Sequence, residues 1–109
     1  MKIKVAATQM SCDWEIENNI KKSINLIEKA AEKGANIILL QELFQTPYFC
    51  IQYDEEIFKL AQTFENNSLI NKMSEVAKKH KVVLPISFFE KDNNAYFNSI
   101  AVIDADGKV

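Results

Sequence analysis

The sequence predicts an α/β protein with elements in the order β-α-β-α-β-β, and three observations support this prediction. Residues 37–40 form an uninterrupted apolar run after a glycine turn, which is typical of a parallel strand buried on both faces. Apolar side chains recur at spacings of three and four before Gly34 and again before His80, which indicates two amphipathic helices. Two apolar stretches near the C-terminus flank a polar turn, the pattern of a hairpin.

The first third of the chain is predicted to form a βαβ unit. Residues 3–10 predict a strand of β-branched and small residues, and Asp13 is the expected N-cap of the following helix. Gly34 should end that helix as its C′ residue. Because such units have a right-handed crossover, the two strands are expected to be parallel. The apolar stripe of the helix consists of Ile16, Ile20, Ile24, Ile27 and Ala31.

The middle of the chain combines a loop with two helices. Residues 43–53 are rich in aromatic side chains without a regular period, which indicates a packed loop rather than a linker. A short helix is expected over residues 54–63, with Ile57, Phe58 and Ala61 facing inward. A second helix should run from Asn67 or Ser68 to His80, with His80 as a capping side chain. Its apolar stripe consists of Leu69, Ile70, Met73, Val76 and Ala77.

The last part of the chain predicts a hairpin of residues 82–90 and 95–104, joined by the turn-forming residues 91–94. Pro85 removes a ladder donor, which predicts a sheet edge or a bulge at that point. Two helices can cover one face of a four-stranded sheet, yet residues 37–40 need cover on both faces. We therefore expect these 109 residues to be the amino-terminal piece of a longer chain.

Composition narrows the class of protein. Hydrophobic residues make up 48% and charged residues 26%, an ordinary balance for a globular domain, and the net charge of −2 gives no reason to expect a nucleic-acid partner. No apolar run approaches the ~18 residues of a membrane span, and the start turns polar too soon for a signal peptide. We expect a cytoplasmic protein without a membrane partner. Cys12 and Cys50 form no CxxC motif, so they are expected to be reduced thiols rather than a bridge or metal ligands.

Glu42 is the candidate catalytic residue. It directly follows the buried strand, at the edge of an open α/β sheet where ligand crevices form. Held among Leu40, Leu43 and Phe44, its carboxylate would be partly shielded from water, a setting that suits a general base. An acid that has simply reached solvent at a strand end remains the alternative.

The same stretch carries a resemblance to a known family. Residues 38–44 (Ile-Leu-Leu-Gln-Glu-Leu-Phe), 47–50 (Pro-Tyr-Phe-Cys) and 4–10 (Lys-Val-Ala-Ala-Thr-Gln-Met) resemble the nitrilase (carbon-nitrogen hydrolase) superfamily. The resemblance implies the amino-terminal part of a nitrilase-type αββα sandwich. It also implies a Glu-Lys-Cys triad in which Glu42 is the glutamate, while the lysine and the cysteine are expected beyond Val109. The isolated piece is therefore expected to be inactive.

The resemblance implies hydrolysis of a non-peptide carbon-nitrogen bond without metal or cofactor. A thiolate would attack a carbonyl or carbamoyl carbon while Glu42 takes the thiol proton and later activates water. Tyr48 and Phe49 closely follow Glu42 and are expected to form a wall of the same pocket, and the resemblance makes Tyr48 a candidate substrate contact. Four stretches look most like the branch that converts N-carbamoylputrescine to putrescine, carbon dioxide and ammonia: residues 41–44, 47–50, 87–90 and 95–99. Ureidopropionase and ω-amidase types are alternatives within the superfamily.

An alternative from another class is a non-catalytic α/β interaction module, with Glu42 as a surface acid and the aromatic loop as a partner patch. A nucleotide-binding module is disfavoured, because turns explain both glycines, Gly34 and Gly107, and no phosphate-cradling loop is left. Neither Cys12 nor Cys50 is expected to be a nucleophile. The expected partners are a small carbamoyl or amide substrate and further copies of the chain in a homo-oligomer.

Overall fold

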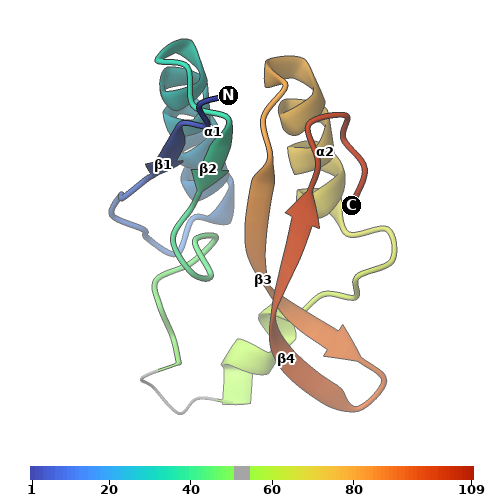
Figure 1. Ribbon diagram of the computed structural model, residues 1–109. Helices are drawn as coiled ribbons and strands as arrows, with labels where there is room; N and C mark the ends of the chain where they lie inside the picture. Colours follow the sequence, from blue (N-terminus) through green and yellow to red (C-terminus); the bar gives the residue numbers. More distant parts are fainter. Residues whose placement is uncertain (51–54) are drawn as a thin grey trace.

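The computed structural model describes residues 1–50 and 55–109, and its elements follow the predicted order (Figure 1). Residues 51–54, which include the end of the aromatic loop and the expected start of the short helix, lie outside the described residues. The elements are β1 (Val5–Ala7), α1 (Ile16–Glu32), β2 (Ile37–Leu39), the 3-10 helix η1 (Glu55–Leu60), α2 (Ser68–His80), β3 (Leu84–Asp92) and β4 (Ala95–Ile103).

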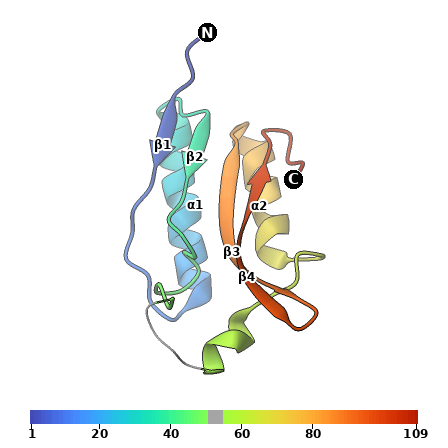
Figure 2. The ribbon, with the colours of Figure 1, turned by 60° about the horizontal axis from the view of Figure 1, so that its bottom comes forward.

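The four strands lie side by side in the order β1-β2-β3-β4 (Figure 2). β1 and β2 pair in parallel, with Val5 opposite Ile37, which confirms the βαβ unit. β3 and β4 pair antiparallel along their whole lengths, which confirms the hairpin. The two halves meet where Ile38 N–H donates to the Val83 carbonyl at 3.0 Å and Val83 N–H donates to the Asn36 carbonyl at 2.9 Å.

Pro85 limits the contact between the two halves of the sheet. Backbone groups of alternate residues in a strand face the same neighbour, so Pro85 faces β2 as Val83 does. Proline has no N–H, and the ladder toward β2 does not continue beyond Val83. Of the two expected alternatives, a sheet edge or a bulge, the bulge is absent, because Pro85 pairs with Val102 in an unbroken register with β4.

Both helices cover the same face of the sheet (Figure 1), and the main core lies between the helices and the strands. The two predicted apolar stripes are confirmed, since every member of both is buried in this core or packed against it. The fully buried side chains at its centre come from α1, β2, α2, β3 and β4. They include Ile27, Ile38, Leu69, Met73, Leu84, Ile86 and Ile103.

The opposite face of the sheet is open. We call it the open face; by alternation along the strands it carries Val5, Leu39, Ser87, Asn98, Ile100 and Val102. Its apolar members are exposed, with Leu39 at 47%, Ile100 at 58% and Val102 at 55%. One face of the strand at residues 37–40 is therefore left uncovered, as expected from the count of two helices, because α1 and α2 both lie on the other side.

The helix ends follow the predictions except at two residues. Gly34 follows α1 with a φ of 89°, as expected for a C′ glycine. At the start of α2, the Asn67 side chain accepts hydrogen bonds from Leu69 N–H and Ile70 N–H, as expected for an N-cap. Asp13 is not the N-cap, because α1 begins only after Glu15.

His80 also differs from its expected role. Its Nε2 lies 3.8 Å from Glu28 Oε1, so it links α2 to α1 instead of capping its own helix. The residue that ends α2 is Lys81, whose φ of 56° turns the chain out of the helix. In the described part of the chain, no helix has both the length and the apolar composition needed to cross a lipid bilayer.

Candidate functional site

Glu42 lies in the turn of residues 42–45 that follows β2. Its side chain is exposed, whereas Leu40, Leu43 and Phe44 are all buried. The prediction that these three side chains shield the carboxylate is therefore wrong for the described chain. They pack into the hydrophobic clusters, and the turn directs the carboxylate away from them.

Leu43 gives this turn its direction. Its φ of 50° lies in the left-handed region, which a branched side chain rarely adopts and which costs about 1–2 kcal/mol. Its N–H donates to Ser87 Oγ at 2.9 Å, and both residues are buried, with 3% and 8% of their surface exposed. Ser87 thus holds the residue next to Glu42 against the open face of β3.

Asn98 contacts the candidate base directly, because its Nδ2 donates a hydrogen bond to Glu42 Oε1. On β4, Asn98 pairs with Phe89 of β3, two residues along from Ser87 and on the same open face. Sequence reasoning assigned no function to Ser87 or Asn98. The sequence signal that could have placed them on the open face is alternation along the strands. Ser87 directly follows the core residue Ile86, and Asn98 lies an odd number of residues before the core residue Ala101.

The start and end of the turn are held by two further side chains. Gln41 Oε1 accepts from Met10 N–H at 2.9 Å, and Gln41 Nε2 donates to Cys12 Sγ at 3.3 Å. Asn19, fully buried in α1, donates to the Gln45 carbonyl at 2.8 Å. Glu42 is therefore an exposed carboxylate on a backbone segment that is tied to β3, to α1 and to the residues after β1.

Tyr48 lies close enough to Glu42 for their charges to interact. A hydrogen bond with the Cys50 side chain raises the pKa of Tyr48, and the negative charges of Cys50 and Glu42 raise it further. The phenol is therefore protonated, and its ring is exposed. Its role as a substrate contact stays a prediction.

An aromatic cluster adjoins Asn98 on the open face. The ring of Phe89 lies 5.0 Å from that of Phe49 and 6.1 Å from that of Phe58, and Phe58 lies 4.7 Å from Tyr96. Phe49 is buried here with Leu43, as predicted for the aromatic loop, whereas Tyr48 of the same loop is exposed. A cavity of about 30 Å³ beside Phe49 and Phe89 has room for about one water molecule, not for an amide substrate.

Cys12 does not have the environment of a nucleophile. Burial raises the pKa of Cys12, although Lys22 lowers it in part, and a protonated thiol attacks carbonyl carbon poorly. The Cys12 thiol donates to the Phe44 carbonyl at 3.2 Å, a structural contact. Cys50 is exposed, and its side chain forms a hydrogen bond with Tyr48.

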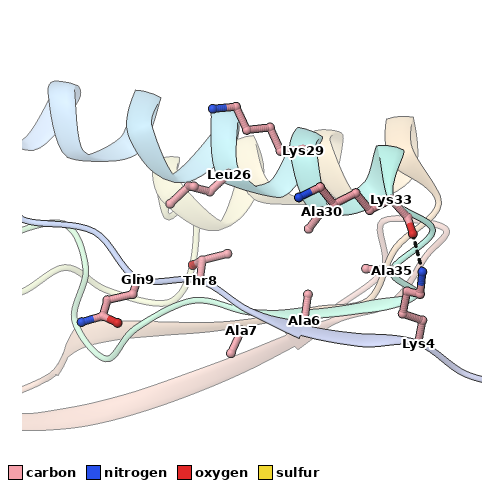
Figure 3. Close-up of a pocket in the computed structure, with 10 residues that line it drawn as sticks. All are labelled: Lys4, Ala6, Ala7, Thr8, Gln9, Leu26, Lys29, Ala30, Lys33 and Ala35. Carbon is pink, nitrogen blue, oxygen red and sulfur yellow. Dashed lines mark hydrogen bonds between the residues drawn. The ribbon is translucent and has the colours of Figure 1, made fainter.

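A larger hollow of about 440 Å³ lies between β1 and α1, away from Glu42 (Figure 3). In this view Ala6 points toward α1 and Ala7 away from it, and Lys4 Nζ donates to the Lys33 carbonyl at 2.7 Å. Its lining includes lysines but no acid, thiol or histidine, so it offers no hydrolytic chemistry. The lining residues are Lys4, Ala6, Ala7, Thr8, Gln9, Leu26, Lys29, Ala30, Lys33 and Ala35. Within residues 1–50 and 55–109, no group of three or more acids, cysteines or histidines gathers as a metal site would require.

Comparisons with known proteins identify the family to which the chain belongs. Residues 4–109 match the family model described as carbon-nitrogen hydrolase. The chain is 46% identical over 105 residues to N-carbamoylputrescine amidase of Arabidopsis thaliana, covering 96% of this chain and 35% of that protein. It is 43% identical over 107 residues to a citrullinase of Francisella tularensis, covering 98% and 37%.

The fold agrees with the same family. A crystal structure of a carbon-nitrogen hydrolase from Helicobacter pylori G27 matches with a TM-score of 0.86 and 31% identity, over 96% of this chain and 36% of that one. The predicted nitrilase-type α/β fold is thereby confirmed for the part that the chain contains. The chain spans about a third of the length of each of these relatives.

Proposed function

Because the chain belongs to the carbon-nitrogen hydrolase family, we propose that it is the amino-terminal part of an amidase in which Glu42 is the general base. The observation that carries this proposal is the geometry of Glu42. Its carboxylate is exposed on a turn held by Gln41 and Leu43, and it accepts a hydrogen bond from Asn98. A general base needs this combination of access to substrate and fixed orientation.

In the proposed reaction, a cysteine from the rest of the protein attacks the carbonyl or carbamoyl carbon. Glu42 accepts the thiol proton and passes it to the departing nitrogen, which leaves as ammonia or an amine. Glu42 then takes a proton from the water that hydrolyses the thioester. A lysine and backbone N–H groups from the rest of the protein hold the oxyanion. Cys12 is excluded as this nucleophile by its raised pKa and its contact with Phe44.

The proposed substrate is N-carbamoylputrescine, and two observations on this chain support it. Tyr48 presents an exposed aromatic ring near Glu42, and a ring face attracts a terminal ammonium group by about 0.5–2 kcal/mol. A substrate that ends in a carboxylate is best held by arginine, and this chain contains none. Phe49, expected as the second wall of the pocket, does not contribute, because it is buried against Phe89.

The sharpest test compares N-carbamoylputrescine with L-citrulline, which differs from it only by a carboxylate next to the terminal amine. We expect the full-length protein to release ammonia from N-carbamoylputrescine with the higher kcat/KM, and N-carbamoyl-β-alanine to be a poor substrate. A clear preference for either acid would refute the substrate while leaving the amidase assignment in place.

The amidase assignment itself is tested by Glu42→Gln in the full-length protein. The amide keeps the shape of the side chain but cannot accept the thiol proton, so turnover should fall by at least roughly 10²- to 10⁴-fold, with an unchanged circular dichroism spectrum. A variant with nearly normal kcat would remove Glu42 from the mechanism.

A further inference from the structure

We propose that Asn98 is a positioning residue that orients the Glu42 carboxylate for proton transfer. This inference rests on the proposed function, because it gives the general base its orientation. It concerns a residue on β4, far from Glu42 in the sequence, which the strand register brings to the same part of the open face.

The first argument is the geometry of the contact. Asn98 Nδ2 donates to Oε1, one of the two carboxylate oxygens, and proton transfer needs only one oxygen. In this proposal, Oε1 accepts the hydrogen bond that orients the carboxylate, and Oε2 accepts the proton. Because Asn98 belongs to a strand that pairs with β3 along its whole length, its position is held more rigidly than a loop residue would be.

The second argument is that the turn and Asn98 are held independently of each other. Ser87 Oγ binds the N–H of Leu43 and so fixes the backbone next to Glu42, while Asn98 acts on the carboxylate at the other end of the side chain. With the backbone fixed at one end and one oxygen fixed at the other, the long glutamate side chain has few remaining rotamers.

The third argument is the charge of the donor. A lysine or arginine in this position would hold the carboxylate ionised and weaken it as a base, since a nearby opposite charge favours the charged form. The amide of Asn98 is neutral, so it orients the carboxylate by hydrogen bonding without an ion pair.

The test is a double-mutant cycle in the full-length protein with Asn98→Asp, Glu42→Gln and the two changes together. Asn98→Asp removes the donor and brings a second carboxylate against Glu42, so the denaturation midpoint should fall. Adding Glu42→Gln should restore most of that loss, because its amide can donate to the introduced carboxylate. The matched control is Asn71→Asp, at an exposed position of α2 on the other side of the sheet, and its effect should add to that of Glu42→Gln without coupling.

The second readout is the pH profile of kcat/KM. Asn98→Asp should move the acidic limb to higher pH by about one unit, and Asn98→Ala should lower kcat about tenfold with little change in KM. Additive effects in the cycle, or an acidic limb that stays where it is, would overturn the proposal. If the protein hydrolyses no carbamoyl or amide substrate, the proposed function fails, yet the cycle still decides whether Asn98 and Glu42 are coupled.

Discussion

Ser87→Ala is the perturbation that most directly tests how Glu42 is held. It removes the acceptor of the Leu43 N–H, and both residues are buried. Leaving a buried donor without a partner costs about 1–3 kcal/mol, and the left-handed Leu43 loses the contact that offsets about 1–2 kcal/mol of backbone strain. We expect the full-length protein to lose about 1–3 kcal/mol of stability.

Activity should fall as well, because the turn can then relax toward a right-handed conformation and move Glu42. A displacement of about 1 Å at a reacting group can cost roughly 10²-fold, so we expect kcat to drop between tenfold and a hundredfold with KM little changed. Steady-state kinetics and urea denaturation measure the two effects. Ser87→Thr keeps the hydroxyl acceptor and should retain more activity than the alanine variant.

The matched control is Ser23→Ala. Ser23 is buried like Ser87, with 1% against 8% of its surface exposed, but its hydroxyl donates to the Ile20 carbonyl within its own helix. This change should therefore leave kcat unaltered. If Ser87→Ala kept both wild-type kcat and wild-type stability, the argument that Ser87 holds the Glu42 turn would be wrong.

Two further predictions concern the chain as it stands. The exposed apolar residues of the open face should make the 109-residue chain self-associate, and this chain should have no amidase activity. Ile100→Lys should reduce its apparent mass in light scattering more than the control Asn25→Lys, which lies on the exposed side of α1. A monomeric, active chain would contradict this prediction. Partial burial raises the pKa of Cys12, so a smaller fraction of this thiol is thiolate at pH 8 than in free cysteine. In the Cys50→Ser chain, iodoacetamide should therefore react with Cys12 more slowly than with free cysteine, and faster labelling would refute this reasoning.

The fold could be predicted wherever the signal lies in neighbouring residues. Asn67 as an N-cap, Gly34 after α1 and the apolar spacing of both helices each act within one or two turns of chain, so the sequence alone determines them. The same holds for the hairpin, whose turn residues and flanking alternation are local. Glu42 could be singled out as the candidate base because it directly follows the apolar run of β2 and because of the family resemblance.

The environment of Glu42 could not be predicted in this way. Whether an acid after a strand is shielded or exposed depends on the direction of the turn, and that direction comes from a left-handed Leu43 bonded to Ser87, a residue from a distant strand. The contact with Asn98 likewise requires the registers of β2, β3 and β4 together. Local propensity is a sum over near neighbours, whereas these contacts join residues that come together only when the sheet forms, so the tertiary structure alone decides them.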